Sequence, residues 1–260
     1  MSIYEQSTVE LLRRFLTEQA GQDRFTSDEI QHWFQVHWPK IKRGTVQAHL
    51  VRTSTNAPAR VHHTVRPGVD DLLYQIGRGE YRRYDAAHDP SPIYPGVTRP
   101  THTEPDEVNI PDESVTLEDG AGATFAYESH LRDYLAANLH TLEPGLRLYE
   151  DEGIRGIEYP IRGRRIDILA VAQDGSLVVI ELKVSRGYDR TVGQILNYIG
   201  SVRQDLADGR PVRGMIVANA FSDELITACQ VTNMDIRLFE YELSFRVRPR
   251  SFGDDGSGRA

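Results

Sequence analysis

Three charged side chains interrupt a stretch of sequence that is otherwise largely apolar. Residues 165–183 read RIDILAVAQDGSLVVIELK, two strand-like segments around a turn, and they include Asp167, Glu181 and Lys183. Glu181 and Lys183 are two residues apart, so they lie on the same face of a strand. Removing water from two neighbouring carboxylates costs several kcal/mol. Two acids and a lysine in such strands therefore indicate chemistry rather than stabilisation of a core.

The turn between the two segments decides whether Asp167 joins the other two side chains. A two-residue loop, Asp174-Gly175, would pair Asp167 with Leu182 and place Glu181 on the opposite face of the sheet. A three-residue loop that begins at Gln173, with the glycine in the left-handed conformation of a bulge, would pair Asp167 with Glu181 instead. We predict the three-residue loop, which brings all three charged groups together.

A cluster of this kind has two interpretations. Lys183 and a neighbouring arginine could each neutralise one acid, which would give an ion-pair network. A divalent cation explains the cluster better, because Mg²⁺ and Mn²⁺ prefer oxygen ligands and bind one or two carboxylates together with water and phosphate. We predict a Mg²⁺ or Mn²⁺ site at Asp167 and Glu181, with the main-chain carbonyl of Leu182 as a further ligand. Lys183 would orient or deprotonate the water that attacks a phosphodiester.

The segments around the cluster alternate between helical and strand-like patterns. Residues 124–142 and 189–209 have apolar side chains at helical spacing, and a further helix is expected from the cap at Ser222. Short apolar segments predict strands over 146–149, 157–161, 212–218, 236–241 and 243–247. Helices between strands imply a sheet covered on both faces. The expected fold class of this half is α/β, with a mixed sheet flanked by helices.

The charged residues and their surroundings resemble a known nuclease family. The spacing of Asp167 and Glu181-Leu182-Lys183 resembles the D…(D/E)-x-K pattern of the PD-(D/E)XK nuclease superfamily, with Ile166 at the proline position. Four longer segments resemble the catalytic domain of the endonuclease NucS (DUF91) family: LEPGLRLYEDEGIRGIEYPI, GRRIDILAVAQDGSLVVIELK, DRTVGQILNYIGSV and VRGMIVA. The resemblance covers residues 124–247.

This resemblance implies a nuclease that acts on DNA with Mg²⁺ or Mn²⁺, on a restriction-endonuclease-like fold. It assigns the same two acids to the metal and the same lysine to catalysis. Three further positions match the family: Glu128 on the first helix, and Gln194 and Tyr198 in a Q-x-x-x-Y pattern. Gln194 and Tyr198 share a helix face because they are four residues apart. Ordinary packing is the alternative for this pair, and a surface position is the alternative for Glu128.

The first 85 residues predict a separate, smaller domain. Ser7-Thr8-Val9-Glu10 and Thr26-Ser27-Asp28-Glu29 are capping boxes, so each should begin a helix. A third helix is expected after Gly44, and residues 71–85 predict a hairpin that turns at residues 77–79. Three helices and a hairpin suggest a winged helix-turn-helix-like domain, whereas NucS proteins carry a β-rich N-terminal domain.

A winged helix-turn-helix would place its third helix in a major groove and its hairpin along the backbone. The candidate DNA contacts are the polar residues of these elements, joined by one arginine beside the catalytic acids: Lys42, Arg43, Gln47, Arg52, Arg78, Arg82, Arg83 and Arg165. The alternative is that they are ordinary solvated charges on a small helical domain that binds protein or packs against the rest of the chain.

The negative charge of the chain is concentrated between the two domains. The net charge is −8, and residues 86–120 hold eight acids, one arginine and six of the 13 prolines. This composition predicts an extended, poorly ordered linker. The expected organisation is therefore a DNA-binding domain over 1–85, a linker over 86–120, a nuclease domain over 121–250 and a disordered tail over 251–260. Outside the linker the charge is close to balanced, so DNA stays a possible partner.

Bulk properties indicate a cytoplasmic protein. No apolar run approaches the length of a membrane span, and the N-terminus lacks the pattern of a secretion signal. Cys229 is the only cysteine, so no internal disulfide can form. We expect a metal-dependent DNA endonuclease in restriction, defence or repair, and a homodimer because cutting two strands usually needs two sites. The alternative is a DNA-binding regulator whose nuclease fold is not catalytic.

Overall fold

The computed structural model describes residues 4–96, 128–184, 191–232 and 234–243. Most of the predicted linker, the tail and all but the first residue of the last predicted strand lie outside these ranges. Within them, no helix has both the length and the apolar character needed to cross a membrane. The N-terminal elements are α1 (Thr8–Glu18), β1 (Phe25–Thr26), α2 (Ser27–His37), α3 (Arg43–Thr53), η1 (Pro58–His62), β2 (Leu73–Gly77) and β3 (Glu80–Arg83).

Both predicted capping boxes start helices. The Ser7 hydroxyl accepts a hydrogen bond from the Glu10 amide (3.4 Å), and the Glu10 carboxylate accepts one from the Ser7 amide (2.7 Å). Thr26 and Glu29 make the same pair of bonds at the start of α2, at 3.2 and 2.7 Å. Each box satisfies amides that a helix end leaves without partners. The sequence therefore fixes the positions of α1 and α2 locally.

The predicted hairpin is also present, and it belongs to a small sheet. The strands follow the order β1-β3-β2, and Gly79 in the β2–β3 turn has φ +73°, a conformation that favours glycine. The chain after β3 stays on this domain: the Ile93 amide donates to the Thr55 carbonyl (2.8 Å), and the Tyr94 hydroxyl donates to Asp71 (2.5 Å). The first part of the predicted linker, up to residue 96, is thus packed rather than extended.

The C-terminal elements form a mixed sheet with helices. They are α4 (Glu128–Ala137), η2 (Leu139–Thr141), β4 (Arg147–Leu148), β5 (Glu150–Asp151), β6 (Ile154–Arg155), β7 (Ile157–Ile161), β8 (Arg164–Val171), β9 (Leu177–Lys183), α5 (Thr191–Asp205), β10 (Val212–Ala218), α6 (Asp223–Val231) and β11 (Ile236–Glu240). The main sheet has the order β11-β10-β9-β8-β4, and β7 also pairs with β8. Strands β9, β10 and β11 are parallel, whereas β8 is antiparallel to its partners. The expected α/β class is confirmed.

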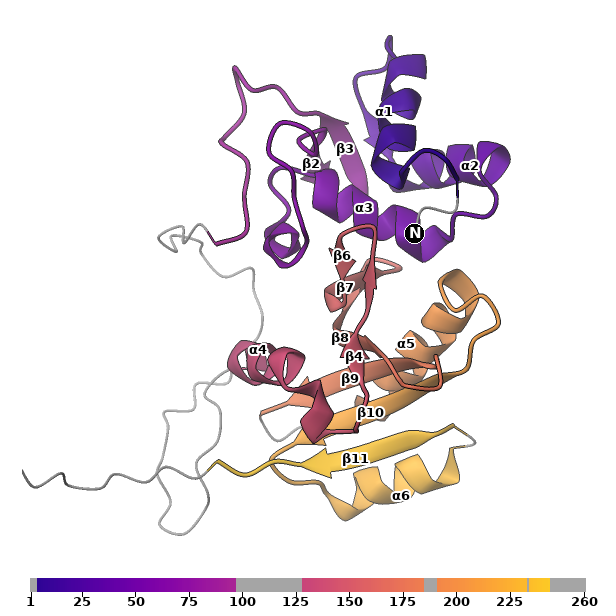
Figure 1. Ribbon diagram of the computed structural model, residues 1–260, viewed down its shortest axis with the longest axis vertical. Coiled ribbons are helices and arrows are strands. Elements are labelled where there is room, and N and C mark those ends of the chain that lie inside the picture. Colours follow the sequence, from indigo (N-terminus) through magenta and orange to yellow (C-terminus); the bar gives the residue numbers. More distant parts are fainter. Residues whose placement is uncertain (1–3, 97–127, 185–190, 233, 244–260) are drawn as a thin grey trace, which may run out of the picture.

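Side chains of β9 alternate between two apolar clusters on opposite faces of the sheet. Leu177 and Val179 belong to the cluster that includes residues of α5 and α6, and Val178 and Ile180 belong to the cluster with α4. Glu181 continues the first series, so its carboxylate points to the α5 face. Figure 1 shows α4 and α5 on the two sides of this sheet.

The turn between β8 and β9 is the predicted three-residue loop. Val171 pairs with Leu177, and the Ala172 amide donates to the Ser176 carbonyl (2.9 Å), which leaves residues 173–175 as the loop. Gly175 has φ +83°, the left-handed conformation expected of it. Continued along the strands, this register sets Asp167 opposite Glu181, on the same face of the sheet.

Helix α3 packs directly on the C-terminal domain, as Figure 1 shows, next to β6 and β7. A methyl group added at Gly44 would lie 3.1 Å from the Asp205 carbonyl oxygen at the end of α5. Ala48, one turn later, is buried in the apolar cluster of the C-terminal sheet. Small residues at positions four apart let the two domains approach closely. The N-terminal domain is therefore packed against the C-terminal domain through the helix predicted to read DNA.

Candidate active site

Four charged side chains from β8, β9 and α4 meet at the carboxyl end of β9. The Lys183 ammonium nitrogen lies 2.9 Å from Oε1 of Glu181 and 3.6 Å from Oε1 of Glu128. Asp167 Oδ2 accepts a hydrogen bond from the Leu182 amide (2.9 Å). Because strand β9 carries Glu181 and Lys183 on one face, both reach the same place as the acid of β8. The structure thus confirms the predicted convergence of the three strand residues and adds Glu128 to them.

Of the two strand carboxylates, that of Glu181 is fully buried and that of Asp167 is half-buried. Glu181 is 1% exposed, and apart from its ion pair with Lys183 no described residue donates to either of its oxygens in hydrogen-bond geometry. Burial, and then the negative charge of Asp167, raise the pKa of Glu181 to about 7. Burial also raises the pKa of Asp167 to about 6, although the Leu182 amide and the Lys183 charge oppose the shift. A bound positive ion would therefore stabilise the site, because it would offset the repulsion between the two carboxylates and the cost of their burial.

Lys183 is held in its charged form. Burial lowers the pKa of its ammonium group, but the charges of Glu181 and Glu128 outweigh this effect and the pKa is raised. A charged lysine can donate hydrogen bonds to water or to a phosphate oxygen, and it offsets negative charge there. In this state it does not accept a proton.

The Q-x-x-x-Y pair lies on the helix that faces the acids. The Gln194 side-chain amide donates to the Tyr198 hydroxyl (3.3 Å), both on α5. Tyr198 is buried, which raises the pKa of its hydroxyl, and the nearby charges of Glu181 and Asp167 raise it further. The structure thus brings this pair to the predicted site, while a catalytic role for it stays a prediction.

The residues present suit a hard divalent cation. Within the part of the chain that the structure describes, no three His, Cys, Asp or Glu side chains form a complete metal cage. Asp167, which accepts one hydrogen bond from the Leu182 amide, and Glu181, which pairs with Lys183, are instead the partial ligand set expected when water and substrate phosphate supply the other ligands. The donors are all oxygen, which favours Mg²⁺ or Mn²⁺ over softer metals.

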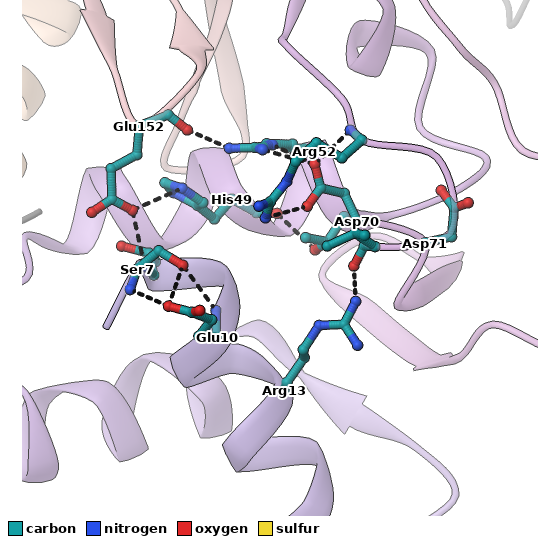
Figure 2. A network of polar contacts seen from close by, with 12 residues as sticks. Ser7, Glu10, Arg13, His49, Arg52, Asp70, Asp71 and Glu152 are labelled. Atoms are coloured by element: carbon teal, nitrogen blue, oxygen red, sulfur yellow. Dashed lines mark hydrogen bonds and ion pairs between the residues drawn. The ribbon is translucent and has the colours of Figure 1, made fainter. Parts of the chain in front are cut away.

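Three of the predicted DNA contacts on and next to α3 are bound by other residues of the protein. Lys42 pairs with Asp208, and the side-chain oxygen of Gln47 accepts a hydrogen bond from the main-chain amide of Arg162 (2.8 Å). Arg52 is buried: its guanidinium binds Asp70 at 2.7 Å and also donates to the Glu152 carbonyl (Figure 2). These side chains would have to leave their partners to reach a phosphate.

The remaining candidates on and near the hairpin differ in exposure. Arg78 donates to the Gly163 carbonyl (3.4 Å) in the turn between β7 and β8, so the hairpin tip also faces the C-terminal domain. Arg82 binds Asp89, and Arg83 donates to three main-chain carbonyls, which include those of residues 16 and 22. The side chains of Arg43 and Arg165 are 55% and 56% exposed, despite ion pairs with Asp28 and Glu158. Their role in DNA binding stays a prediction.

The sequence analysis missed two charged residues next to the acids. Arg132 lies one turn beyond Glu128 on α4, and its charge lowers the pKa of Asp167. Arg132 pairs with Glu158 of β7, which lies across the strand ladder from Asp167. The four-residue spacing from Glu128 was a usable signal for Arg132. The sequence holds no comparable signal for Glu158, because its position depends on the pairing of β7 with β8.

Two family models match separate parts of the chain. Residues 7–83 match a domain of unknown function, DUF7669, and residues 127–247 match the endonuclease NucS C-terminal domain. The second match contains all the residues of the charged cluster. The division agrees with the two domains of the structure.

Curated relatives match over the same part of the chain. Endonuclease NucS 2 of Halobacterium salinarum is 32% identical over 47% of this chain and 47% of its own length. Endonuclease NucS of Pyrococcus abyssi is 30% identical over 35% of this chain and 36% of its own length. The chain thus spans less than half the length of these relatives.

Two solved structures are similar to part of the chain. A repair endonuclease from Pyrococcus abyssi is 24% identical, with a TM-score of 0.38, over 47% of this chain and 50% of that one. An EndoMS complex with double-stranded DNA is 24% identical, with a TM-score of 0.38, over 49% of each chain. Together, the family model and the sequence relatives identify residues 127–247 as a NucS-like nuclease catalytic domain.

Proposed function

We propose that this chain is a metal-dependent DNA endonuclease. The observation that carries the proposal is the meeting of Asp167, Glu181 and Lys183 on one face of the sheet. It is supported by the NucS match over the same residues and by the names of the relatives, which are endonucleases. The intact charged cluster disfavours the alternative of a non-catalytic regulator.

Asp167 and Glu181 would hold a Mg²⁺ or Mn²⁺ ion, with the main-chain carbonyl of Leu182 as a further ligand. When bound, such an ion lowers the pKa of a coordinated water and stabilises the charge that develops on phosphate. The chain's own residues do the rest. Lys183 donates hydrogen bonds that orient the attacking water and offset charge on the phosphate, and Glu128 holds the ammonium group in place.

The helix α5 supports this arrangement. Tyr198 closes the apolar side of the site, and Gln194 fixes its hydroxyl by a hydrogen bond. The exclusion of water on this side strengthens every electrostatic interaction with the phosphate. We assign these two residues a positioning role.

The N-terminal domain, which we propose to be winged-helix-like, would direct the nuclease to its DNA. Because α3 packs on the nuclease domain, the two domains would present DNA-binding groups together rather than as separately tethered modules. DNA contact by α3 itself would require the interface to open. The expected homodimer stays a prediction, and the mass of the protein in solution tests it.

The first experiment measures cleavage of plasmid, linear, single-stranded, mismatched and modified DNA with Mn²⁺ or Mg²⁺ and with EDTA. We expect metal-dependent cleavage of at least one substrate. Asp167→Asn and Lys183→Ala should each reduce the rate on the order of 10²–10³-fold or more, because both remove charge stabilisation at the reacting phosphate.

The matched control is Asp174→Asn. Asp174 lies in the β8–β9 turn, where it is exposed and accepts hydrogen bonds from its neighbour Ser176. This variant makes the same chemical change in the same hairpin and should cut at the wild-type rate. Full activity of both site variants would contradict the assignment of the catalytic cluster.

A further inference from the structure

One carboxylate next to the catalytic acids bridges cations from three elements. Glu158 of β7 pairs with Arg132 of α4, with Arg165 of β8 (3.0 Å) and with His62 of η1 (3.8 Å, charged only when protonated). The Arg132 guanidinium also binds Asp133 (3.0 Å). Both domains thus contribute to this cluster, because η1 belongs to the N-terminal domain.

The cluster adjoins the active site on the β7 side. Ile157 pairs with Ile168, and Tyr159 pairs with Ile166, so Glu158 stands across the ladder from Asp167. On α4, Arg132 follows Glu128 by four residues, and Glu128 reaches Lys183. A backbone bound at the catalytic residues would therefore pass near Arg132, one turn beyond Glu128 on α4, and near Arg165, two residues before Asp167 on β8.

Glu158 is held in an unusual conformation. Its φ angle is +46° within strand β7, a left-handed conformation that strains a residue with a side chain. Backbone strain of this kind persists where the surrounding structure fixes it, often at functional sites. Here the strained residue is the one that joins the two arginines.

A carboxylate between two guanidinium groups occupies the place that suits a phosphate. Arginine binds carboxylate and phosphate oxygens with the same fork of N–H donors. We propose that Arg132 and Arg165 form a subsite for a backbone phosphate that flanks the scissile one, and that Glu158 fills this subsite until DNA displaces it. The proposal rests on the proposed function and names the residues that would hold the substrate beside the reacting bond.

A purely structural network would behave differently. If the cluster only joined η1 to the nuclease domain, Glu158→Gln would weaken the fold and leave DNA affinity unchanged. If Glu158 competes with phosphate, the same variant frees two guanidinium groups and binds DNA more tightly. The sign of the change in affinity therefore separates the two roles.

The molecule offers a matched control at the far end of the sheet. Glu143 also bridges two arginines, Arg213 at 2.6 Å and Arg237 at 3.0 Å. Arg213 pairs with Val178, whereas Lys183 lies five residues further along β9. At 3.3 Å per residue, this control cluster is about 16 Å from the catalytic lysine along the strand.

The experiment measures binding of a labelled DNA duplex and a labelled single strand to the full chain, by fluorescence anisotropy in EDTA over a range of salt. We expect Arg165→Ala to weaken binding several-fold and to lower the slope of log K against log salt by about one. Glu158→Gln should tighten binding several-fold, and Glu143→Gln should leave it unchanged. Thermal melting of each variant shows that it folds.

Arg132 is only 12% exposed, so its replacement by alanine could disturb the fold. Arg132→Lys keeps the charge and loses the fork, and it should weaken binding less than Arg165→Ala. Wild-type affinity in folded Arg165→Ala, or equal effects of Glu158→Gln and Glu143→Gln, would overturn the subsite. If the wild type cuts DNA and the variants bind DNA as the wild type does, the subsite alone is contradicted. If the variants bind DNA with altered affinity but the wild type cuts no DNA, the proposed nuclease function is contradicted instead.

Discussion

The charged side chain of Asp167 lowers the stability of the fold. It is desolvated, it faces the like charge of Glu181, and its main compensation is a hydrogen bond from the Leu182 amide. Natural proteins keep such residues where function needs them, and replacing them often stabilises the fold. The charge at this position therefore has a measurable structural effect, independent of catalysis.

The first prediction follows from this effect. Asp167→Asn keeps an oxygen that can accept from the Leu182 amide but removes the repulsion with Glu181. In EDTA the variant should gain about 1–3 kcal/mol in free energy of unfolding, since one pKa unit corresponds to about 1.4 kcal/mol. Urea denaturation measures this gain. A variant less stable than the wild type would show that the carboxylate is already compensated.

The same comparison with Mn²⁺ present gives a control. If Asp167 is a metal ligand, the metal should stabilise the wild type and have a smaller effect on Asp167→Asn, because binding to the folded state alone raises its stability. Equal stabilisation of both proteins would place the metal elsewhere.

For single residues, the sequence predicted those positions that depend on local structure. The register of β8 and β9 follows from a three-residue loop around Gly175, so the convergence of Asp167 with Glu181 could be predicted. The partners of Arg52 and Glu158 could not, because both depend on contacts between segments far apart in the chain. Charge alone does not tell a DNA contact from an ion pair inside the protein.

The arrangement of strands β7 and β8 depends on Gly156, although this glycine does not have a positive φ angle. The Gly156 amide donates to the Tyr149 carbonyl (2.8 Å), and its carbonyl accepts from the Leu169 amide (2.7 Å). A methyl group at Gly156 would lie 2.0 Å from the Leu169 carbonyl oxygen. The close approach of two backbones here requires glycine, and it sets the start of the strand that carries Glu158.

Gly156→Ala should therefore destabilise the protein by about 3 kcal/mol, at the upper end for overpacking. The control is Gly200→Ala on α5, where no described atom outside the adjoining turns of the helix lies within 4 Å of the added methyl group. That variant should be neutral or gain up to about 1 kcal/mol, since alanine favours helix. Urea denaturation of both variants measures the difference. Similar stabilities would mean that the β6–β7 segment adjusts easily.

Helices and long strands were predictable because their signals are short-range. Capping boxes mark the starts of α1 and α2, and largely apolar segments mark β8 to β10. The segment predicted as a strand over 146–149 contains β4, whereas β5 and β6 have two residues each, too few for any periodicity. The part of the linker up to residue 96 was mistaken for extended chain because proline and charge do not reveal the contacts of Ile93 and Tyr94.

The whole molecule is organised by the contact between its two domains, which the sequence indicated only as the alternative to DNA binding. The turn between β5 and β6 enters the N-terminal domain, where Glu152 accepts a hydrogen bond from the Thr8 amide (2.9 Å) and the neighbouring Gly153 carbonyl accepts from the Thr64 amide (2.8 Å). Figure 2 shows Glu152 between His49 and the start of α1. Gly44 and Ala48 complete the contact. Small residues on a helix predict close packing but not its partner.

His49 makes this contact sensitive to acid. Its ring is buried, which lowers its pKa to about 4, although Glu152 at 3.5 Å opposes the shift. Arg52 on the same helix, Asp70 on the following loop and His63 beyond η1 are the other charged or titratable groups that act on it. Protonation of His49 is therefore unfavourable in the folded state, whereas the unfolded chain takes up that proton near the ordinary pKa of 6.5.

The stability that the neutral ring contributes is fully present above pH 6.5 and is lost as the pH falls towards 4. At pH 5 this single group should lower the free energy of unfolding by about 2 kcal/mol relative to pH 7.5. His49→Gln removes the titration and should lose about 2 kcal/mol less than the wild type over the same interval. His32→Gln, which changes an exposed histidine on α2, should keep the wild-type loss. Urea denaturation at the two pH values measures all three proteins, and an identical loss in His49→Gln would mean that other groups control the acid sensitivity of the domain contact.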